Sequence, residues 1–96
     1  MPSAPEDPDS EAQQVAAATA VLGRHGIPAG AREFRVRQEF FRHGWDVRVV
    51  EQGGVWSVHA VKPGRPDAGA QGTTEGNAVR RALAAAIGLD EATGSS

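Results

Sequence analysis

Three histidines, His25, His43 and His59, are the side chains in this 96-residue chain best suited to acid–base catalysis or metal binding. An imidazole titrates near neutral pH and binds metal ions through a neutral nitrogen, so closely spaced histidines would indicate either chemistry. No two of the three stand in an HxH or HxxxH pattern. We therefore expect solvated histidines at a helix end, in a turn and on an exposed strand, and no metal site.

Nucleophilic and nucleotide chemistry have equally little support in the sequence. Ser57 lies between Trp56 and Val58, without the Gly-x-Ser-x-Gly elbow that exposes a catalytic serine. The carboxylates of the central region are scattered, and the glycines of 69–76 lack the Lys-Ser/Thr ending of a phosphate-binding loop. We expect a protein that is not an enzyme and that needs no cofactor.

A β-hairpin is predicted over Trp45–Lys62, because Gly53-Gly54 forms a two-residue turn signal between alternating strands. Such a turn fixes the register, since a slip of one residue would move every side chain to the other face. The predicted pairs are Glu51 with Trp56, Val49 with Val58, Val47 with Ala60, and Trp45 with Lys62. One face then carries the mostly apolar set Trp45, Val47, Val49, Trp56, Val58 and Ala60.

Two helices flank this hairpin in the sequence. The first is predicted over Ser10–His25, with Ser10 and Gln13 as a capping box and Gly26 as its C-terminal stop. The second begins at Thr73 or Thr74 and ends at Gly88. Its apolar stripe consists of Val79, Ala82, Leu83, Ala86 and Ile87, and Arg80 and Arg81 are expected to face away.

The segment Glu33–Arg42 fits two structures. As a strand it would pair with the hairpin through a turn at His43-Gly44, which places Glu39 opposite Arg48 as a favourable charge pair. As a helix it would align Val36 and Phe40, with Gly44 as its C-cap. The strand explains more of the residues, so we expect a strand here. Residues 63–72 are expected to form a loop, in which one or two residues near Ala70-Gln71 can be extended.

The predicted fold is α+β, a three-stranded antiparallel meander with both helices on one face, in the order α-β-β-β-α. Residues 1–9 and 90–96 are rich in small and acidic residues and are expected to be disordered tails. A single domain over 10–89 remains, consistent with the length of the chain.

The outer face of this sheet is the predicted contact surface. It combines arginines and a histidine with apolar side chains, a mixture that favours protein contact over nucleic acid. An ordinary solvated face, on which charged side chains simply point to water, is the other interpretation of the same residues. We expect a protein partner or a second copy of the chain there, with nucleic acid as the alternative. The predicted partner-binding residues are Arg35, Arg37, Phe41, Arg48, Val50, His59 and Val61.

Composition narrows the class of protein. The formal net charge is -2, which argues against a globally basic nucleic-acid binder, although acidic residues gather near both ends and leave the middle mildly basic. There is no cysteine, and no apolar run approaches the length of a membrane span. A bacterial, cytoplasmic protein that binds neither membranes nor metals is expected.

The stretch from the glycine turn to Leu83 resembles the HicB-type antitoxin domain of bacterial toxin–antitoxin pairs. The shared features are a glycine turn, an aromatic strand residue, a Pro-x-x-Pro loop, a Gln-Gly-x-Thr step and an alanine-bearing helix. The resemblance implies a non-enzymatic fold that binds a small toxin, although the family's acidic pair is replaced here by Gly76-Asn77. The matching residues are Gly54, Trp56, Pro63, Pro66, Gln71, Gly72, Thr74, Ala78, Ala82 and Leu83.

The predicted element order is also similar to that of a double-stranded RNA-binding domain. Gly72-Thr73-Thr74 matches the opening of that family's second helix. The positions at which the family carries cations hold Glu75, Gly76 and Val79 instead. Because phosphate contacts by cations supply most of RNA affinity, the resemblance implies a shared topology rather than a shared activity.

Overall fold

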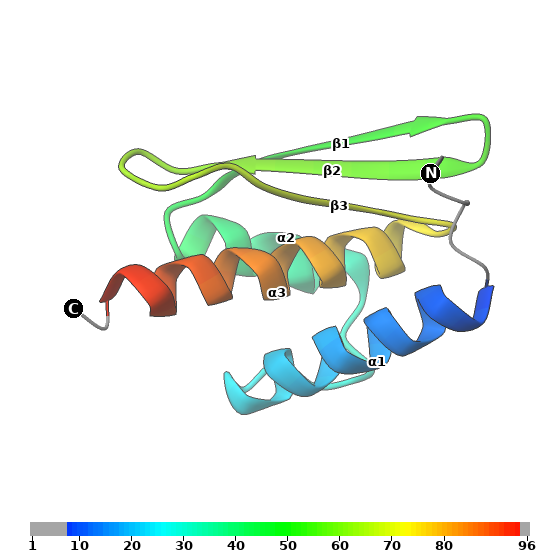
Figure 1. Cartoon of the computed structure of the whole chain (residues 1–96), viewed down its shortest axis with the longest axis horizontal. Coiled ribbons are helices and arrows are strands. Elements are labelled where there is room, and N and C mark those ends of the chain that lie inside the picture. The colour runs from blue at the N-terminus through cyan, green and yellow to red at the C-terminus, as the bar shows by residue number, and fades with distance from the viewer. Residues whose placement is uncertain (1–7, 95–96) are drawn as a thin grey trace, which may run out of the picture.

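A computed structural model describes residues 8–94, and within them the elements follow the order α-α-β-β-β-α. The sheet forms one layer, α2 and α3 lie together beneath it, and α1 lies on the far side of α3 (Figure 1). The α+β class and the antiparallel meander are as predicted. The elements are α1 (Pro8–Arg24), α2 (Glu33–Arg42), β1 (Asp46–Gln52), β2 (Val55–Val61), β3 (Ala68–Gly72) and α3 (Glu75–Gly94).

The predicted hairpin is confirmed as β1 and β2. Glu51 pairs with Trp56 and Val47 with Ala60, in the predicted register. Gly53 and Gly54 have φ values of 60° and 81°, which is the positive-φ backbone that a tight turn needs. The predicted inward side chains are buried or packed against the core. Trp45 and Lys62 lie just beyond the paired residues, and the Lys62 Nζ is 5.9 Å from the centre of the Trp45 ring.

The strand predicted at Glu33–Arg42 is wrong, because this segment forms helix α2. Val36 and Phe40, one helical turn apart, are both fully buried. The helix ends as the alternative prediction described: Gly44 has a φ of 82°, and the Trp45 N–H donates to the Phe40 carbonyl at 2.8 Å. The predicted hairpin turn at His43-Gly44 and the Glu39–Arg48 pair are therefore absent.

The third strand comes instead from the segment expected to be a loop. Strand β3 pairs with β2 in antiparallel register, with Val58 opposite Ala70. Its residues Ala-Gly-Ala-Gln-Gly have little strand preference of their own, so pairing with β2 determines their structure. Gly72 lets β3 approach the start of α3, since a Cβ there would lie 2.9 Å from the Ala78 backbone nitrogen.

Helix α3 is longer than predicted. It is capped by Thr74, whose hydroxyl accepts a hydrogen bond from the Asn77 N–H at 3.1 Å, but it continues through Gly88 to Gly94. Residues 90–94, expected in a disordered tail, are therefore helical, and 95–96 lie outside the described residues. Residues 8 and 9, also expected in a disordered tail, belong to α1, and residues 1–7 lie outside the described residues.

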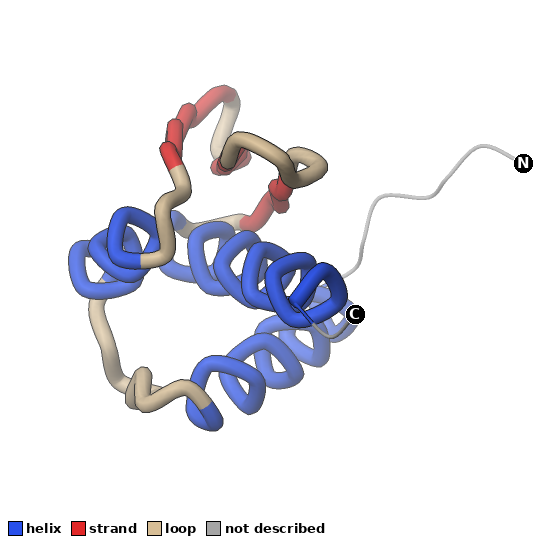
Figure 2. Tube along the Cα trace, turned by 90° about the vertical axis from the view of Figure 1, so that its left-hand side faces the viewer, coloured by secondary structure: helices blue, strands red, loops and turns tan. Residues whose placement is uncertain are grey.

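Helix α1 begins at Pro8, so Ser10 lies inside the helix rather than at its cap. Its end is confirmed, because Gly26 has a φ of 82° and the Ile27 N–H returns to the Leu22 carbonyl at 3.0 Å. The helix packs on α3 and not directly beneath the sheet (Figure 2), since α2 occupies the place beside α3. Two helices do cover one face of the sheet, but they are α2 and α3.

Candidate functional site

The outer face of the hairpin brings together four of the seven predicted contact residues. Arg48 on β1 lies directly opposite His59 on β2, and all four side chains, those of Arg48, Val50, His59 and Val61, are exposed. Asp46, Arg48, His59 and Val61 line a depression of about 190 Å³. The helices lie on the other side of the sheet, so this surface is open (Figure 1).

The polar groups of this face are partly engaged with each other. The His59 Nε2 lies 2.9 Å from an Asp67 carboxylate oxygen, and both side chains are more than half exposed. Beside them, the Gln71 amide donates to the Ser57 hydroxyl at 3.3 Å. These exposed groups supply hydrogen-bond donors and acceptors to a ligand that approaches the sheet.

Apolar surface lies among these polar groups. Val50 is 58 % exposed and Val61 is 38 % exposed, and they lie toward opposite ends of the hairpin. Val55, next to the turn, is exposed as well. The face therefore combines one arginine, one histidine and several exposed valines. Of these residue types, arginine is one that protein interfaces contain more often than the rest of the surface does.

The other three predicted residues lie elsewhere, because they belong to α2. The Arg37 guanidinium pairs with Glu75 at the start of α3 at 3.1 Å, and Arg35 lies 3.4 Å from the buried Glu39. Phe41 is exposed on the helix surface. Their assignment to the sheet face depended on the strand prediction and is wrong for the same reason. The cationic charge of the outer face is correspondingly smaller than predicted.

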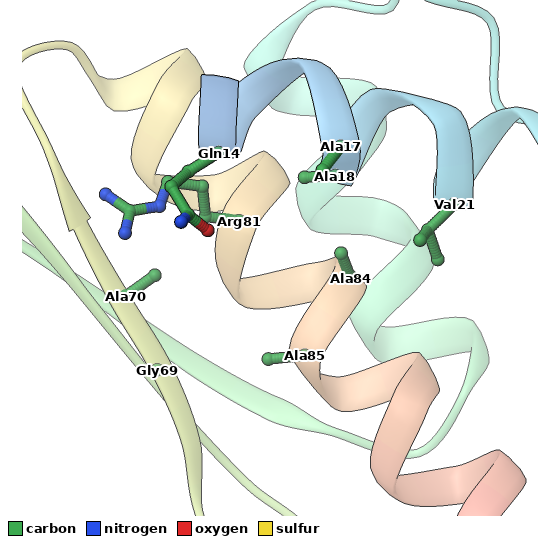
Figure 3. Close-up of a pocket in the computed structure, with 9 residues that line it drawn as sticks. All are labelled: Gln14, Ala17, Ala18, Val21, Gly69, Ala70, Arg81, Ala84 and Ala85. Atoms are coloured by element: carbon green, nitrogen blue, oxygen red, sulfur yellow. The ribbon is translucent and has the colours of Figure 1, made fainter. Parts of the chain in front are cut away.

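A second hollow, of about 380 Å³, lies between α1, α3 and β3 (Figure 3). Alanines form most of its lining, with Val21 at one end and Gln14 and Arg81 at the other. Arg81 was predicted to face away, but its guanidinium donates to the Gln71 carbonyl of β3 at 2.6 Å and so joins the helix to the strand. This hollow gathers small apolar side chains and no cluster of catalytic groups.

The histidines are distributed over distant parts of the fold. His25 lies 2.7 Å from Glu91 at the helix ends, His43 lies 3.8 Å from Glu39, and His59 pairs with Asp67 on the sheet. Among residues 8–94, no group of three metal-ligating side chains converges. Each histidine lies next to a different carboxylate, so the three histidines do not form one site.

Three polar side chains to which the sequence analysis assigned no tertiary contact hold the layers together. The Glu11 carboxylate accepts hydrogen bonds from the Thr73 hydroxyl and N–H and from the Asn77 amide, at 2.6, 3.0 and 2.8 Å. The hydrogen bond from the Thr73 hydroxyl is the largest influence on the pKa of Glu11 and lowers it. Arg80, predicted to face away, instead donates to the Ala29 and Ala31 carbonyls before α2.

The third of these groups is Asp90, near the end of α3. Its carboxylate accepts hydrogen bonds from the Trp45 indole, the Lys62 ammonium and the Arg65 guanidinium, each at 3.1 Å. Partial burial raises the pKa of Asp90, and these three donors lower it by more, so that the net shift is downward. No short sequence motif marks this cluster, because its members are separated by up to 45 positions.

Within the described residues no helix is long and apolar enough to cross a membrane. On the outer sheet face, exposed charge and exposed apolar side chains lie together on one open layer. Comparison with known proteins finds no matching family model, no matching curated protein and no matching solved structure.

Proposed function

We propose that this chain is a non-catalytic binding module whose outer sheet face contacts a protein partner. The main support for the proposal is that helices cover only one face of the sheet. Helices α2 and α3 bury that face, and the other face exposes Arg48, Val50, His59 and Val61 to solvent. An exposed apolar surface interspersed with an arginine is a frequent feature of interaction sites.

The charge on this face favours protein over RNA as the partner. RNA binding depends on several cations that displace counterions from the phosphates. On the outer face Arg48 is accompanied by Asp46 in the same depression, and His59 by Asp67. The other two predicted arginines point to carboxylates on α2 and α3. RNA binding is the weaker alternative.

The resemblance to HicB-type antitoxins supports a small protein as the partner. From the chemistry of the face, we expect the partner to carry a carboxylate that pairs with Arg48. Beside this carboxylate we expect an apolar group that packs against the valines. Arginine binds carboxylates through two parallel hydrogen bonds, which gives such a contact directional specificity.

Reversal of the charge at Arg48 tests this proposal. We expect Arg48→Glu to weaken partner binding by at least about tenfold, because a carboxylate on the partner would then meet a like charge. The measurement is a quantitative pull-down from the native host with the tagged chain, followed by titration of the recovered partner. The melting temperature should change little, since Arg48 is exposed.

The matched control is Arg24→Glu, the same charge reversal on α1, which lies on the far side of α3 from the sheet. Equal recovery of the partner with both variants would contradict the proposed surface. A gel shift at increasing salt concentration tests the RNA alternative, because RNA binding must fall steeply as the salt concentration rises.

A further inference from the structure

Strand β3 has an open edge. It is a border strand of the sheet and pairs with β2 alone. The Gln71 carbonyl accepts a hydrogen bond from Arg81 of α3, which places this carbonyl on the side away from β2. Because the direction of the backbone groups alternates along an antiparallel strand, the N–H and the carbonyl of Gly69 point the same way. The five residues of β3 include no charged residue and no proline, the usual protection of an edge against another extended chain.

The hollow of about 380 Å³ adjoins this edge (Figure 3). Gly69 and Ala70 of β3 form one wall of the hollow, and α1 and α3 form the others. Ala70 is opposite the buried Val58, so its side chain lies on the helix side of the sheet. Side chains directly opposite each other in neighbouring strands lie on the same face. A residue paired with Ala70 would therefore point its side chain into the hollow.

We propose that an extended segment of a partner protein pairs with β3 and places a large aliphatic side chain in this hollow. The segment runs antiparallel to β3, and main-chain hydrogen bonds join it to Gly69 and Gln71. Its residue opposite Ala70 enters the hollow. In strand addition of this kind, the main-chain hydrogen bonds supply affinity and the pockets for alternate side chains supply specificity. The surface is separate from the outer sheet face proposed above.

The charge of the lining indicates a second feature of the segment. Among the nine residues that line the hollow, Arg81 is the one with a charged side chain, and it lies toward the carboxyl end of β3. The nearby Glu11 carboxylate is outside this lining and accepts hydrogen bonds from Thr73 and Asn77. A guanidinium carries five N–H donors and binds carboxylates well. We therefore expect an acidic residue two positions before the aliphatic one.

A second copy of the chain fits this surface poorly. Two β3 strands paired about a twofold axis at Ala70 would bring the two hollows face to face. Each hollow would then receive the other copy's alanine, which is too small to fill it. A segment with a longer side chain at this position removes more apolar surface from water.

Titration with a designed peptide tests the proposal. The probe is fluorescein-labelled Ser-Glu-Thr-Leu-Thr-Val-Ser-amide, which places its leucine opposite Ala70 and its glutamate at the Arg81 end when it pairs antiparallel to β3. We expect saturable binding to the full chain with a Kd below about 1 mM, measured by fluorescence anisotropy. In amide NMR spectra of the chain, the signals of Gly69 and Gln71 should shift on binding.

Methylation of single backbone nitrogens of the probe tests for strand pairing. The nitrogen of the second threonine faces Gly69, so its methylation removes a donor to β3 and should weaken binding at least about tenfold. The leucine nitrogen faces away from β3, and its methylation is the matched control, with an expected change below about threefold. Replacement of the leucine by alanine should weaken binding at least about tenfold, because the hollow is then left unfilled.

Two variants of α1 test the hollow itself. Ala17 lines the hollow and Ala16 does not, and both side chains are exposed, so neither change alters the core. We expect Ala17→Phe to weaken binding of the probe at least about tenfold, because the new ring occupies the hollow, and Ala16→Phe to leave binding unchanged. Circular dichroism verifies that both variants are folded.

Three results would overturn the proposal: no saturable binding, equal effects of the two methyl groups, or equal effects of the two phenylalanines. Sedimentation equilibrium provides a fourth test, since self-association of the wild type that Ala17→Phe abolishes would place a second copy in the hollow instead. Arg48→Glu changes the outer sheet face and should leave binding of the probe unchanged. Failure of this inference is therefore distinguishable from failure of the function proposed above.

Discussion

Replacement of Trp45 by alanine is expected to lower the free energy of unfolding by about 3–5 kcal/mol, because a large aromatic side chain is removed from the core. Trp45 is 1 % exposed and lies between α2 and β1. A domain of this size has a total stability of only about 4–12 kcal/mol, so this loss is a large fraction of it and should markedly lower the urea concentration at which the chain unfolds. Urea denaturation followed by circular dichroism measures the difference.

The conservative change Trp45→Phe separates the packing of this side chain from its hydrogen bond. Phenylalanine retains most of the apolar volume and loses the indole N–H that donates to Asp90. We expect a loss of about 1.5–3 kcal/mol, the range for a hydrogen bond to a charged group. If Trp45→Ala denatured at the wild-type urea concentration, the assignment of Trp45 to the core would be wrong.

The second large effect is expected at Asp90, whose carboxylate joins α3 to the start of β1 and to the loop after β2. Asp90→Asn keeps the size of the side chain and removes the charge that accepts from Trp45, Lys62 and Arg65. Because the site is still partly exposed, we expect a loss of about 1.5–3 kcal/mol at neutral pH. The control is Glu91→Gln, which alters the exposed pair with His25 and should cost less than about 1 kcal/mol.

The effect of Asp90→Asn should depend on pH. The pKa of Asp90 is lower in the folded chain than in the unfolded chain, since the three donors outweigh the desolvation that opposes them. Its stabilising contribution is therefore present above the unfolded pKa and is lost as the pH falls through the folded pKa. Unfolding curves of the wild type and Asp90→Asn should begin to converge below about pH 4 and should approach each other further as the pH falls. A difference that is constant from neutral to acidic pH would contradict this role of the charge.

The sequence predicted correctly where two local signals agreed. At Gly53-Gly54 the turn chemistry and the alternation of side chains required the same register, and both are local properties of the chain. The inward set of the hairpin, and with it the outward positions of Arg48 and His59, followed directly. The C-terminal glycine of α1 was predictable for the same reason, because positive φ at Gly26 is a local requirement.

Where the sequence misled, tertiary contacts decided between local alternatives. Glu33–Arg42 satisfies a strand pattern and a helix pattern, and burial of Val36 and Phe40 one turn apart selects the helix. Once this segment is a helix, the third strand must come from 68–72, whose small residues carry no strand signal. Gly88 does not end α3, since the contacts of Asp90 stabilise the helix beyond it.

The same error explains which site residues were misplaced. Arg35, Arg37 and Phe41 were assigned to the sheet only because their segment was taken as a strand. The four residues assigned through the hairpin register are exposed on the outer face. The hydrogen bonds of Glu11, Arg80 and Asp90 join residues that are 25 to 66 positions apart in the sequence. Local sequence patterns could therefore not have predicted them.

The central claim, that the outer sheet face contacts another protein, is tested most directly by photo-crosslinking in the native host. A photoreactive phenylalanine analogue is placed at His59, in the middle of the outer face, or at Ala16, on the exposed surface of α1. We predict that irradiation links the chain with the analogue at 59 to a second, different polypeptide, and that the analogue at 16 gives no such adduct. An adduct at 16 and none at 59, or an adduct at 59 with RNA alone, would contradict the claim.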